Sequence, residues 1–310
     1  MTEQLIAIIG PTAVGKTAVA LELADLLRAR GNDPVAVSAD AFQVYEGLDV
    51  LTAKPDAEEN DRLEHRLVST VPVNVEYSVA EFADSAHAEI DALLAAGRTP
   101  LVVGGTGLYM RAALTELDLK PRADPELRAE IERDLDELGA EALHARLPAE
   151  VASAVHPSDR KRIVRALELE QMGEAIHDRS DQLWSGDLRH PTVLFGLVIE
   201  REILDQRIDA RVVRMLDQGV LDEVELALER EASRTARKAI GFAEIAALVH
   251  GDATREAVAE RIARRHRQYG KRQLTWMRKV AGIEIVDRTE LNDAETAAML
   301  AERLDSLPAR

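Results

Sequence analysis

Short apolar runs alternate with amphipathic stretches in the N-terminal part of the chain. The run LIAII at 5–9 precedes a glycine-containing turn and a helical pattern at 17–30. Further buried-strand patterns lie at 34–38 and 100–104, with a helical stretch at 79–96 between them. This alternation predicts an α/β fold with a parallel sheet that helices cover on both faces.

The pattern changes between Asp124 and Asp187 into charged helical segments rich in alanine and leucine. One of them, DPELRAEIERDLDELG, has a proline in its first turn and a glycine at its end. The run TVLFGLVIE at 192–200 returns to a buried-strand pattern. We therefore expect a catalytic core domain made of residues 1–123 and 188–310, interrupted by an all-helical insertion domain at 124–187.

The remaining sequence is mostly helical in pattern. Helices are predicted at about 201–230, 235–250 and 254–280, before a short strand, IEIVD, and a last helix.

The segment GPTAVGKT at 10–17 matches the P-loop pattern and lies between a predicted strand and a predicted helix. Glycines permit tight curvature, backbone amides and the helix terminus favour an anion, Lys16 adds positive charge, and the Thr17 hydroxyl can ligate Mg²⁺. The sequence predicts a P-loop NTPase-like fold that binds a diphosphate or triphosphate. The binding residues are Gly10, Pro11, Thr12, Ala13, Val14, Gly15, Lys16 and Thr17. The loop does not identify the reaction, because kinases, NTPases and diphosphate-releasing transferases all use it.

Asp40 follows the second predicted strand, at the sheet edge where open α/β sheets bind ligands. Its carboxylate could hold Mg²⁺ through water, accept a proton from an attacking amine or hydroxyl, or merely cap the next turn. The glycine-rich turn GGTGLY at 104–109 favours close backbone approach to a ligand, whereas Thr106 by itself could simply cap the following helix.

The net charge and its distribution along the chain bear on whether the protein binds nucleic acid. The formal net charge of -17 counts against a simple nucleic-acid binder. However, the segment from Arg255 to Lys279 contains nine Lys or Arg residues and only two Glu. A second basic cluster lies at 160–165. A polyanion could therefore bind locally, although solvated helix faces explain the same charge runs.

Other features of the composition exclude several classes. The absence of cysteine rules out disulfides and thiolate sites, and the scattered histidines, His65 and His266 among them, form no metal-binding pattern. No apolar run approaches the length that crosses a bilayer, and the N-terminus MTEQLIAIIG lacks the features of a signal peptide. We expect no membrane association and a cytoplasmic location.

Five segments resemble the tRNA dimethylallyltransferases, also called IPP transferases. They are GPTAVGKT, SADAFQVYEGLDVLTAKP at 38–55, LVVGGTGLYMRAAL at 101–114, HPSDRKRIVRALEL at 156–169 and YGKRQLTWMRK at 269–279. The resemblance implies transfer of a dimethylallyl group from dimethylallyl diphosphate to N6 of the tRNA adenosine just 3′ of the anticodon. It also implies Mg²⁺ as cofactor, and the tRNA anticodon stem-loop and the allylic diphosphate as partners of a monomer. The P-loop then binds a leaving diphosphate, and ATP need not be consumed.

Carried over residue by residue, the resemblance makes Asp40 the general base for N6 and adds Lys16, Thr17 and Thr106 as catalytic residues. The positions implied to contact tRNA are Asp40, Ala41, Phe42, Gln43, Thr106, Arg128, Lys161, Arg162, Ile163, Val164, Arg165, Lys238, Ala239, Ile240, Gly241, Phe242 and Ala243. We expect Trp276 to be a core residue.

The chain departs from the family pattern at Ala41, Glu46, Leu51 and His266, where the family usually has Ser, Arg, Gly and Thr. Three alternatives to the tRNA-modifying enzyme stay open: an isopentenyltransferase acting on free AMP or ADP, a P-loop small-molecule kinase, and a non-catalytic tRNA-binding protein. The helical insertion with its basic cluster favours tRNA, because a free nucleotide needs no grip on an anticodon.

Overall fold

In a computed structural model, which describes residues 4–117, 119–121, 123–174 and 188–306, the chain divides into two compact units. Unit 1 comprises Met1–Leu117 and Asp187–Arg310, and unit 2 is Asp118–Gly186. The helical insertion was predicted at 124–187, of which 175–187 lie outside the described residues. No helix in the described part of the chain is long and apolar enough to span a bilayer.

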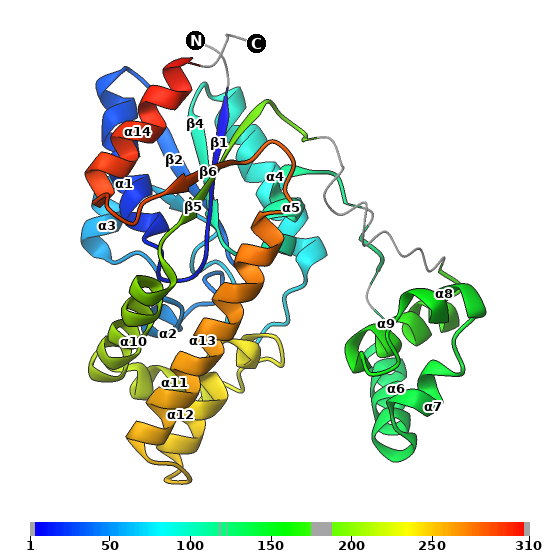
Figure 1. Ribbon diagram of the computed structural model, residues 1–310. Helices are drawn as coiled ribbons and strands as arrows, with labels where there is room; N and C mark the ends of the chain where they lie inside the picture. The colour runs from blue at the N-terminus through cyan, green and yellow to red at the C-terminus, as the bar shows by residue number, and fades with distance from the viewer. Residues whose placement is uncertain (1–3, 118, 122, 175–187, 307–310) are drawn as a thin grey trace. The chain divides into compact units, whose positions relative to one another are not determined.

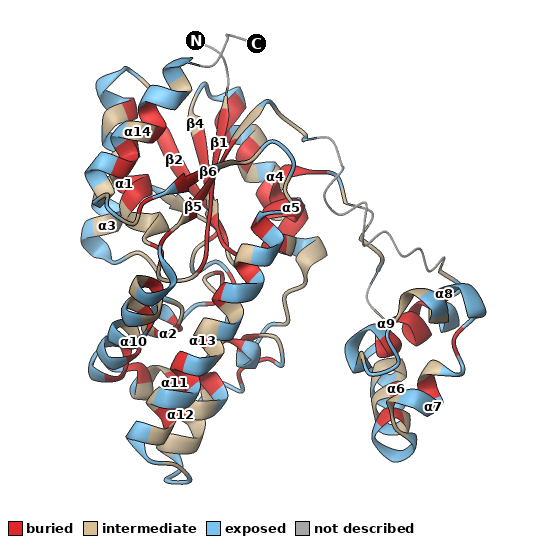
Figure 2. Cartoon of the chain, viewed as in Figure 1, coloured by how far each residue is buried: buried red, intermediate tan, exposed pale blue. Residues whose placement is uncertain are grey.

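Unit 1 contains a six-stranded sheet with the order β3-β2-β4-β1-β5-β6, and every pair in it is parallel. The apolar runs place β1 and β2 where the sequence predicts them, and all residues of both strands are buried (Figure 2). The parallel α/β core is confirmed. The strand bounds are β1 Leu5–Ile9, β2 Pro34–Ala39, β3 His65–Arg66, β4 Thr99–Gly104, β5 Thr192–Val198 and β6 Glu284–Asp287.

Helices cover both faces of the sheet (Figure 1). On one face α1 (Lys16–Ala29) packs beside α14 (Asp293–Ser306), and on the other α4 (Val79–Ala95) packs beside α5 (Gly107–Leu114). A capping box fixes the start of α4, because Ser78 Oγ accepts from the Glu81 amide and the Glu81 carboxylate accepts from the Ser78 amide.

Further helices gather beyond the carboxyl ends of the strands (Figure 1). The helix predicted at 201–230 is divided at Gly219, whose φ of 88° is left-handed, and the one predicted at 235–250 starts only after Gly241, with φ of 103°. The helices here are α2 Asp49–Thr52, α10 Arg201–Asp217, α11 Val220–Glu229, α12 Phe242–Val249 and α13 Arg255–Met277, with a short 3₁₀ turn at Ala236–Lys238. Helix α3 (Ala57–Arg62) lies instead beside α1, where Arg62 pairs with Glu22 and Asp25.

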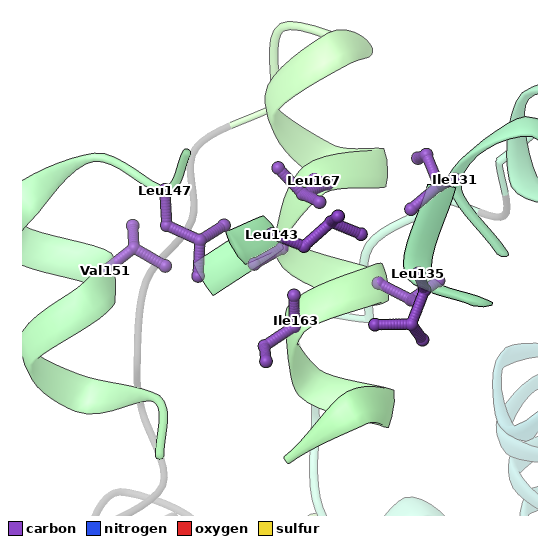
Figure 3. Close-up of a cluster of buried hydrophobic side chains, with 9 residues drawn as sticks. Ile131, Leu135, Leu143, Leu147, Val151, Ile163 and Leu167 are labelled. Atoms are coloured by element: carbon purple, nitrogen blue, oxygen red, sulfur yellow. The ribbon is translucent and has the colours of Figure 1, made fainter. Parts of the chain in front are cut away.

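Unit 2 is a small helical domain with its own apolar core (Figure 3). Its helices are α6 Pro125–Leu138, α7 Ala140–His144, α8 Ala149–Ala154 and α9 Arg160–Gln171. Leu143 and Ile163 are fully buried, and Ile131, Leu135 and Leu167 pack around them. The core of unit 2 is thus built from side chains on all four helices.

Candidate active site

The P-loop joins β1 to α1 and folds as a curved cradle. Gly15 has φ of 96° and Ala13 has φ of 64°, so the loop uses the left-handed region at two positions. The Lys16 ammonium folds over the loop and donates to the carbonyl oxygens of Gly10 at 3.1 Å and Pro11 at 3.0 Å. The loop amides, the start of α1 and Lys16 together form an anion-binding site.

A buried arginine supports this loop from behind. Arg288, 1% exposed, follows β6 and donates through Nη1 to the Val14 carbonyl at 3.0 Å. Its Nη2 pairs with Asp293 at 2.5 Å. A Cβ on Gly15 would lie 2.4 Å from Arg288 Nη1, so that position needs glycine for space as well as for backbone angle. Sequence reasoning missed Arg288, because a lone arginine after a strand carries no motif.

Asp40 lies at the carboxyl end of β2 and lines the same cavity as Lys16. Its Oδ1 accepts from the Phe42 amide at 2.9 Å, so the turn-capping role is real. Among the described residues, Oδ2 has no hydrogen-bond partner. One oxygen of Asp40 therefore holds the turn, and the other is left to act on a ligand in the cavity.

The cavity has a volume of about 760 Å³ and is bounded by the P-loop, the segment after β2, α10 and α13. Pockets of this size commonly enclose a small-molecule substrate or cofactor. The lining brings Lys16, Thr17 and Asp40 together, as predicted from the sequence, and adds Arg211, His266 and Tyr269, which were not predicted as site residues.

Helices α10 and α13 fasten the P-loop from the other side of the cavity. Arg211 Nη1 donates to the Thr12 hydroxyl at 3.0 Å, and the Thr12 amide donates to Gln273 Oε1 at 2.9 Å. Only the tertiary structure brings these groups together, because Thr12 and Gln273 are 261 positions apart in sequence.

Burial sets the protonation states in the cavity. It lowers the pKa of Lys16 to about 8, an effect that the Asp40 carboxylate opposes and the Arg211 cation reinforces. Burial also lowers the pKa of Arg211, which stays charged because an arginine starts so high. Burial raises the pKa of Tyr269 to about 12, so its hydroxyl is protonated at neutral pH.

Thr106 is the N-cap residue of α5, but its side chain makes no capping hydrogen bond. Its hydroxyl is instead 2.7 Å from the Tyr269 hydroxyl. The glycine-rich turn approaches the P-loop backbone closely, since a Cβ on Gly105 would lie 2.5 Å from the Gly10 carbonyl oxygen. Trp276, expected in the core, is 41% exposed; it packs over Gly107, where an added Cβ would meet its ring at 2.0 Å.

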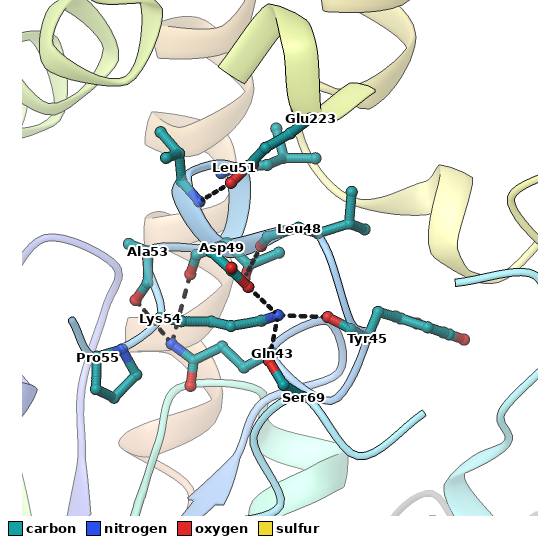
Figure 4. A network of polar contacts seen from close by, with 12 residues as sticks. Gln43, Tyr45, Leu48, Asp49, Leu51, Ala53, Lys54, Pro55, Ser69 and Glu223 are labelled. Carbon is teal, nitrogen blue, oxygen red and sulfur yellow. Dashed lines mark hydrogen bonds and ion pairs between the residues drawn. The ribbon is translucent and has the colours of Figure 1, made fainter. Parts of the chain in front are cut away.

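The segment after β2 is held by buried polar contacts (Figure 4). Lys54, whose side chain is 3% exposed, donates to Ser69 Oγ at 2.8 Å and also to the Tyr45 carbonyl. The side-chain amide of Gln43 accepts through Oε1 from the Ser38 hydroxyl at 2.7 Å and donates through Nε2 to the Ala53 carbonyl at 2.9 Å. Gln43 was predicted to contact tRNA, but most of its bonding capacity is used inside the protein.

A carboxylate from α11 completes this arrangement. Glu223 accepts from the amides of Val50 at 2.7 Å and Leu51 at 3.0 Å (Figure 4). The Leu51 side chain, 2% exposed, lies against Gly241, where an added Cβ would meet it at 3.1 Å. The Leu51 departure therefore fills the core, whereas Glu46 is exposed.

The stretch 238–243 divides by burial. Lys238 and Ala243 are exposed, and Ala239 and Ile240 line the cavity. Phe242, predicted to contact tRNA, is 2% exposed, and its side chain packs in the core. Gly241 is buried as well, so it serves the backbone turn that starts α12.

The predicted tRNA-contacting stretch of unit 2 divides in the same way, because α9 is amphipathic. Lys161 and Arg162 are exposed. Ile163 and Val164, also predicted to contact tRNA, are 0% and 3% exposed, and their side chains belong to the core of the unit. They hold the helix that presents the basic residues.

Two further predicted tRNA contacts in unit 2 share one buried carboxylate. Glu168, 1% exposed, accepts from Arg128 at 2.9 Å and from Arg165 at 3.0 Å. Arg165 also donates to the Lys120 carbonyl at 2.9 Å. These ion pairs fix where both guanidinium groups lie. The signal missed in the sequence was a glutamate on the apolar side of α9.

Comparison with known proteins gives a consistent result. The family model described as IPP transferase matches residues 43–280. A tRNA dimethylallyltransferase of Thermobifida fusca is 42% identical over 283 residues, covering 89% of this chain and 87% of that protein.

Solved structures share the fold. The full-length tRNA isopentenylpyrophosphate transferase of Bacillus halodurans aligns with a TM-score of 0.70 and 34% identity, covering 98% of this chain and 97% of that one. A eukaryotic dimethylallyltransferase acting on tRNA aligns with a TM-score of 0.78 over 100% of this chain and 81% of that one; at 24% identity, this likeness concerns the fold alone. With a family model that spans most of its length and relatives that align almost end to end, the chain belongs to the IPP transferase family.

Proposed function

We propose that the protein transfers a dimethylallyl group from dimethylallyl diphosphate to N6 of the tRNA adenosine just 3′ of the anticodon. The observation that carries this proposal is that Asp40, with one free carboxylate oxygen, lines the same cavity as the P-loop residue Lys16. A proton acceptor thus shares one cavity with a diphosphate cradle. Relatives named tRNA dimethylallyltransferase support the same reaction.

The diphosphate end of the site is built for a leaving group. P-loop amides, Lys16 and Arg211 place positive charge where the allylic C–O bond breaks and charge develops on the departing diphosphate. The negative charge on the diphosphate is greater in the transition state than in the substrate. Groups that stabilise this charge therefore accelerate the chemical step. The P-loop in this proposal holds a leaving group rather than a nucleotide fuel.

The base end activates a weak nucleophile. The adenine N6 lone pair attacks C1 of the allylic group while the C1–O bond breaks, and diphosphate leaves with the bonding electrons. N6 then carries an extra proton, which passes to the free oxygen of Asp40. Thr106, held by Tyr269, lies in the neighbouring turn and is proposed to contact the flipped-out nucleotide.

Mg²⁺ fits the oxygen donors here. The Thr17 hydroxyl lines the cavity and can be one ligand, with diphosphate oxygens as others. In the described part of the chain, no group of three or more His, Cys, Asp or Glu could hold a metal ion, so a cation in the cavity would share its ligands with the substrate. When bound, Mg²⁺ neutralises charge on the diphosphate.

The tRNA partner is proposed to contact both units. Lys161 and Arg162 of unit 2 and Lys238 of unit 1 are exposed, so their charges can bind phosphates. These local basic groups allow binding despite the net charge of -17. We propose that the anticodon stem-loop binds there, and that the enzyme acts as a monomer in the cytoplasm, where its tRNA substrate is found.

The test uses transcribed, unmodified tRNA with dimethylallyl diphosphate and Mg²⁺, followed by mass measurement of the digested nucleosides. We expect one adenosine per tRNA to gain a dimethylallyl unit in place of a hydrogen, next to the anticodon. Prenylated AMP with untouched tRNA would instead identify an adenylate isopentenyltransferase, and ADP release from ATP would identify a kinase. Tight tRNA binding without any modification would leave only a binding protein.

A further inference from the structure

One side of α13 turns polar side chains toward the cavity at helical spacing. His266, Tyr269 and Gln273 all line it, at positions i, i+3 and i+7. Tyr269 is bonded to Thr106, and Gln273 accepts from the P-loop amide of Thr12. Two of the three side chains therefore have protein partners that position them.

His266 is the exception. It is only 6% exposed, yet neither Nδ1 nor Nε2 has a hydrogen-bond partner among the described residues. Buried polar atoms are almost always satisfied, because desolvating them without a partner costs free energy. Both ring nitrogens are thus unpaired on a residue that lines the P-loop cavity, which makes a ligand in that cavity the candidate partner.

The charges around the ring show which kind of partner fits. Burial lowers the pKa of His266 to about 3, with the cations Arg211 and Arg265 contributing to that value. Arg265 is neutralised by Glu244 at 2.8 Å, whereas the bond that Arg211 makes among the described residues is to the Thr12 hydroxyl. The imidazole is therefore neutral and lies near an arginine that holds the P-loop, and among the described residues no carboxylate is bonded to that arginine.

We infer that His266 is a diphosphate-binding residue, whose ring N–H donates a hydrogen bond to a diphosphate oxygen held by the P-loop and Arg211. The inference rests on the proposed function, which brings an allylic diphosphate into this cavity. It gives the His266 departure from the family pattern a role: a longer side chain with an N–H donor stands where the family usually has a hydroxyl.

A second consequence follows from charge. The cations that act on the ring are Arg211 on α10 and Arg265 on α13, and the cavity that His266 lines also holds Lys16, Asp40 and Tyr269. A bound diphosphate adds negative charge to this set and so raises the pKa of His266 from its low value. At neutral pH the free ring is neutral, and one of its nitrogens carries the N–H that donates.

The test is calorimetric titration of the full chain with inorganic diphosphate and Mg²⁺ at pH 7. We expect His266→Ala to weaken binding about tenfold or more, the effect of losing a hydrogen bond to a charged group. His266→Gln keeps an N–H donor and should recover part of the affinity. The matched control is His250→Ala, which changes an exposed histidine at the C-cap of α12 and should bind as the wild type does.

Equal diphosphate affinity in the wild type and His266→Ala would overturn the inference. Should His266→Ala fail to fold, His266→Leu, which fills the same space without a polar atom, replaces it in the same titration, and wild-type affinity in that variant overturns the inference. The proposed function is separated by assaying wild-type transfer to tRNA alongside. If diphosphate binding depends on His266 but the wild type does not modify tRNA, only the proposed function is excluded. If the wild type modifies tRNA but diphosphate binding does not depend on His266, only this inference is excluded.

Discussion

Arg288 Nη1 donates to the carbonyl oxygen of Val14 at 3.0 Å, which connects the loop after β6 to the P-loop across 274 positions of sequence. The Arg288 side chain is 1% exposed, and it also donates to the Gly15 carbonyl at 3.4 Å and forms the ion pair with Asp293. The curvature of the P-loop thus depends on a residue near the end of the chain. Hydrogen bonds of a buried charged donor are among the stronger ones in proteins.

Replacing Arg288 should loosen that loop. We expect Arg288→Met to lower the free energy of unfolding by about 2 kcal/mol, because buried carbonyls lose a charged donor. Diphosphate affinity should fall as well, since the loop amides lose their fixed geometry. Urea denaturation and diphosphate titration measure the two effects. The control, Arg303→Met, removes an exposed pair with Glu284 and should change stability by less than about 0.5 kcal/mol. Unchanged stability and diphosphate affinity in Arg288→Met would show that the conformation of the P-loop does not depend on Arg288.

Asp40→Asn tests the general base without disturbing the turn. The asparagine oxygen can still accept from the Phe42 amide, but the side chain can no longer take a proton from N6. We expect kcat to fall about 10²–10⁴-fold, with diphosphate affinity changed only a few-fold. Single-turnover assays on tRNA give the rate. Asp61→Asn on the exposed surface of α3 is the control. Wild-type turnover in Asp40→Asn would exclude Asp40 as the base.

The decline of activity at alkaline pH should follow the titration of Lys16. Its pKa is lowered to about 8, so in the free enzyme the ammonium loses its proton as pH rises through that value. The neutral amine binds diphosphate less well, and kcat/KM for dimethylallyl diphosphate should therefore decline above about pH 8. Lys16→Arg keeps its charge to much higher pH and should lose this decline, although its activity is lower. If kcat/KM of Lys16→Arg still declines near pH 8, the titrating group is a residue other than Lys16.

Glu168 is expected to position the basic residues of unit 2. Glu168→Gln removes the carboxylate shared by Arg128 and Arg165. Since both arginines are partly exposed, we expect a loss of about 1–3 kcal/mol rather than the larger cost of a fully buried pair. Hydrogen exchange of α9 and tRNA-binding titrations measure stability and affinity. Glu170→Gln, an exposed neighbour on the same helix, is the control. Equal tRNA affinity in the two variants would argue against a positioning role.

Much of the fold could be predicted because its strands are continuous apolar runs. The segments at 5–9 and 34–38 become β1 and β2 almost residue for residue. The two-residue strand β3, His65–Arg66, was missed, since two residues carry no periodicity. The division of the predicted helix 201–230 at Gly219 was missed because a single glycine inside a helical pattern signals a break only weakly.

The sequence by itself determined the parts of the site that lie on one short stretch of chain: the P-loop from Gly10 to Thr17 and Asp40 at the end of β2. Only the tertiary structure decided which distant side chains complete it, because helix packing brings Arg211 and His266 to the cavity and the pairing of β6 with β5 brings Arg288 to the P-loop. It also decided that Ile163 and Phe242 are core residues. Local patterns specify strands and turns, whereas contacts between distant residues depend on the crossing of helices that no local pattern records.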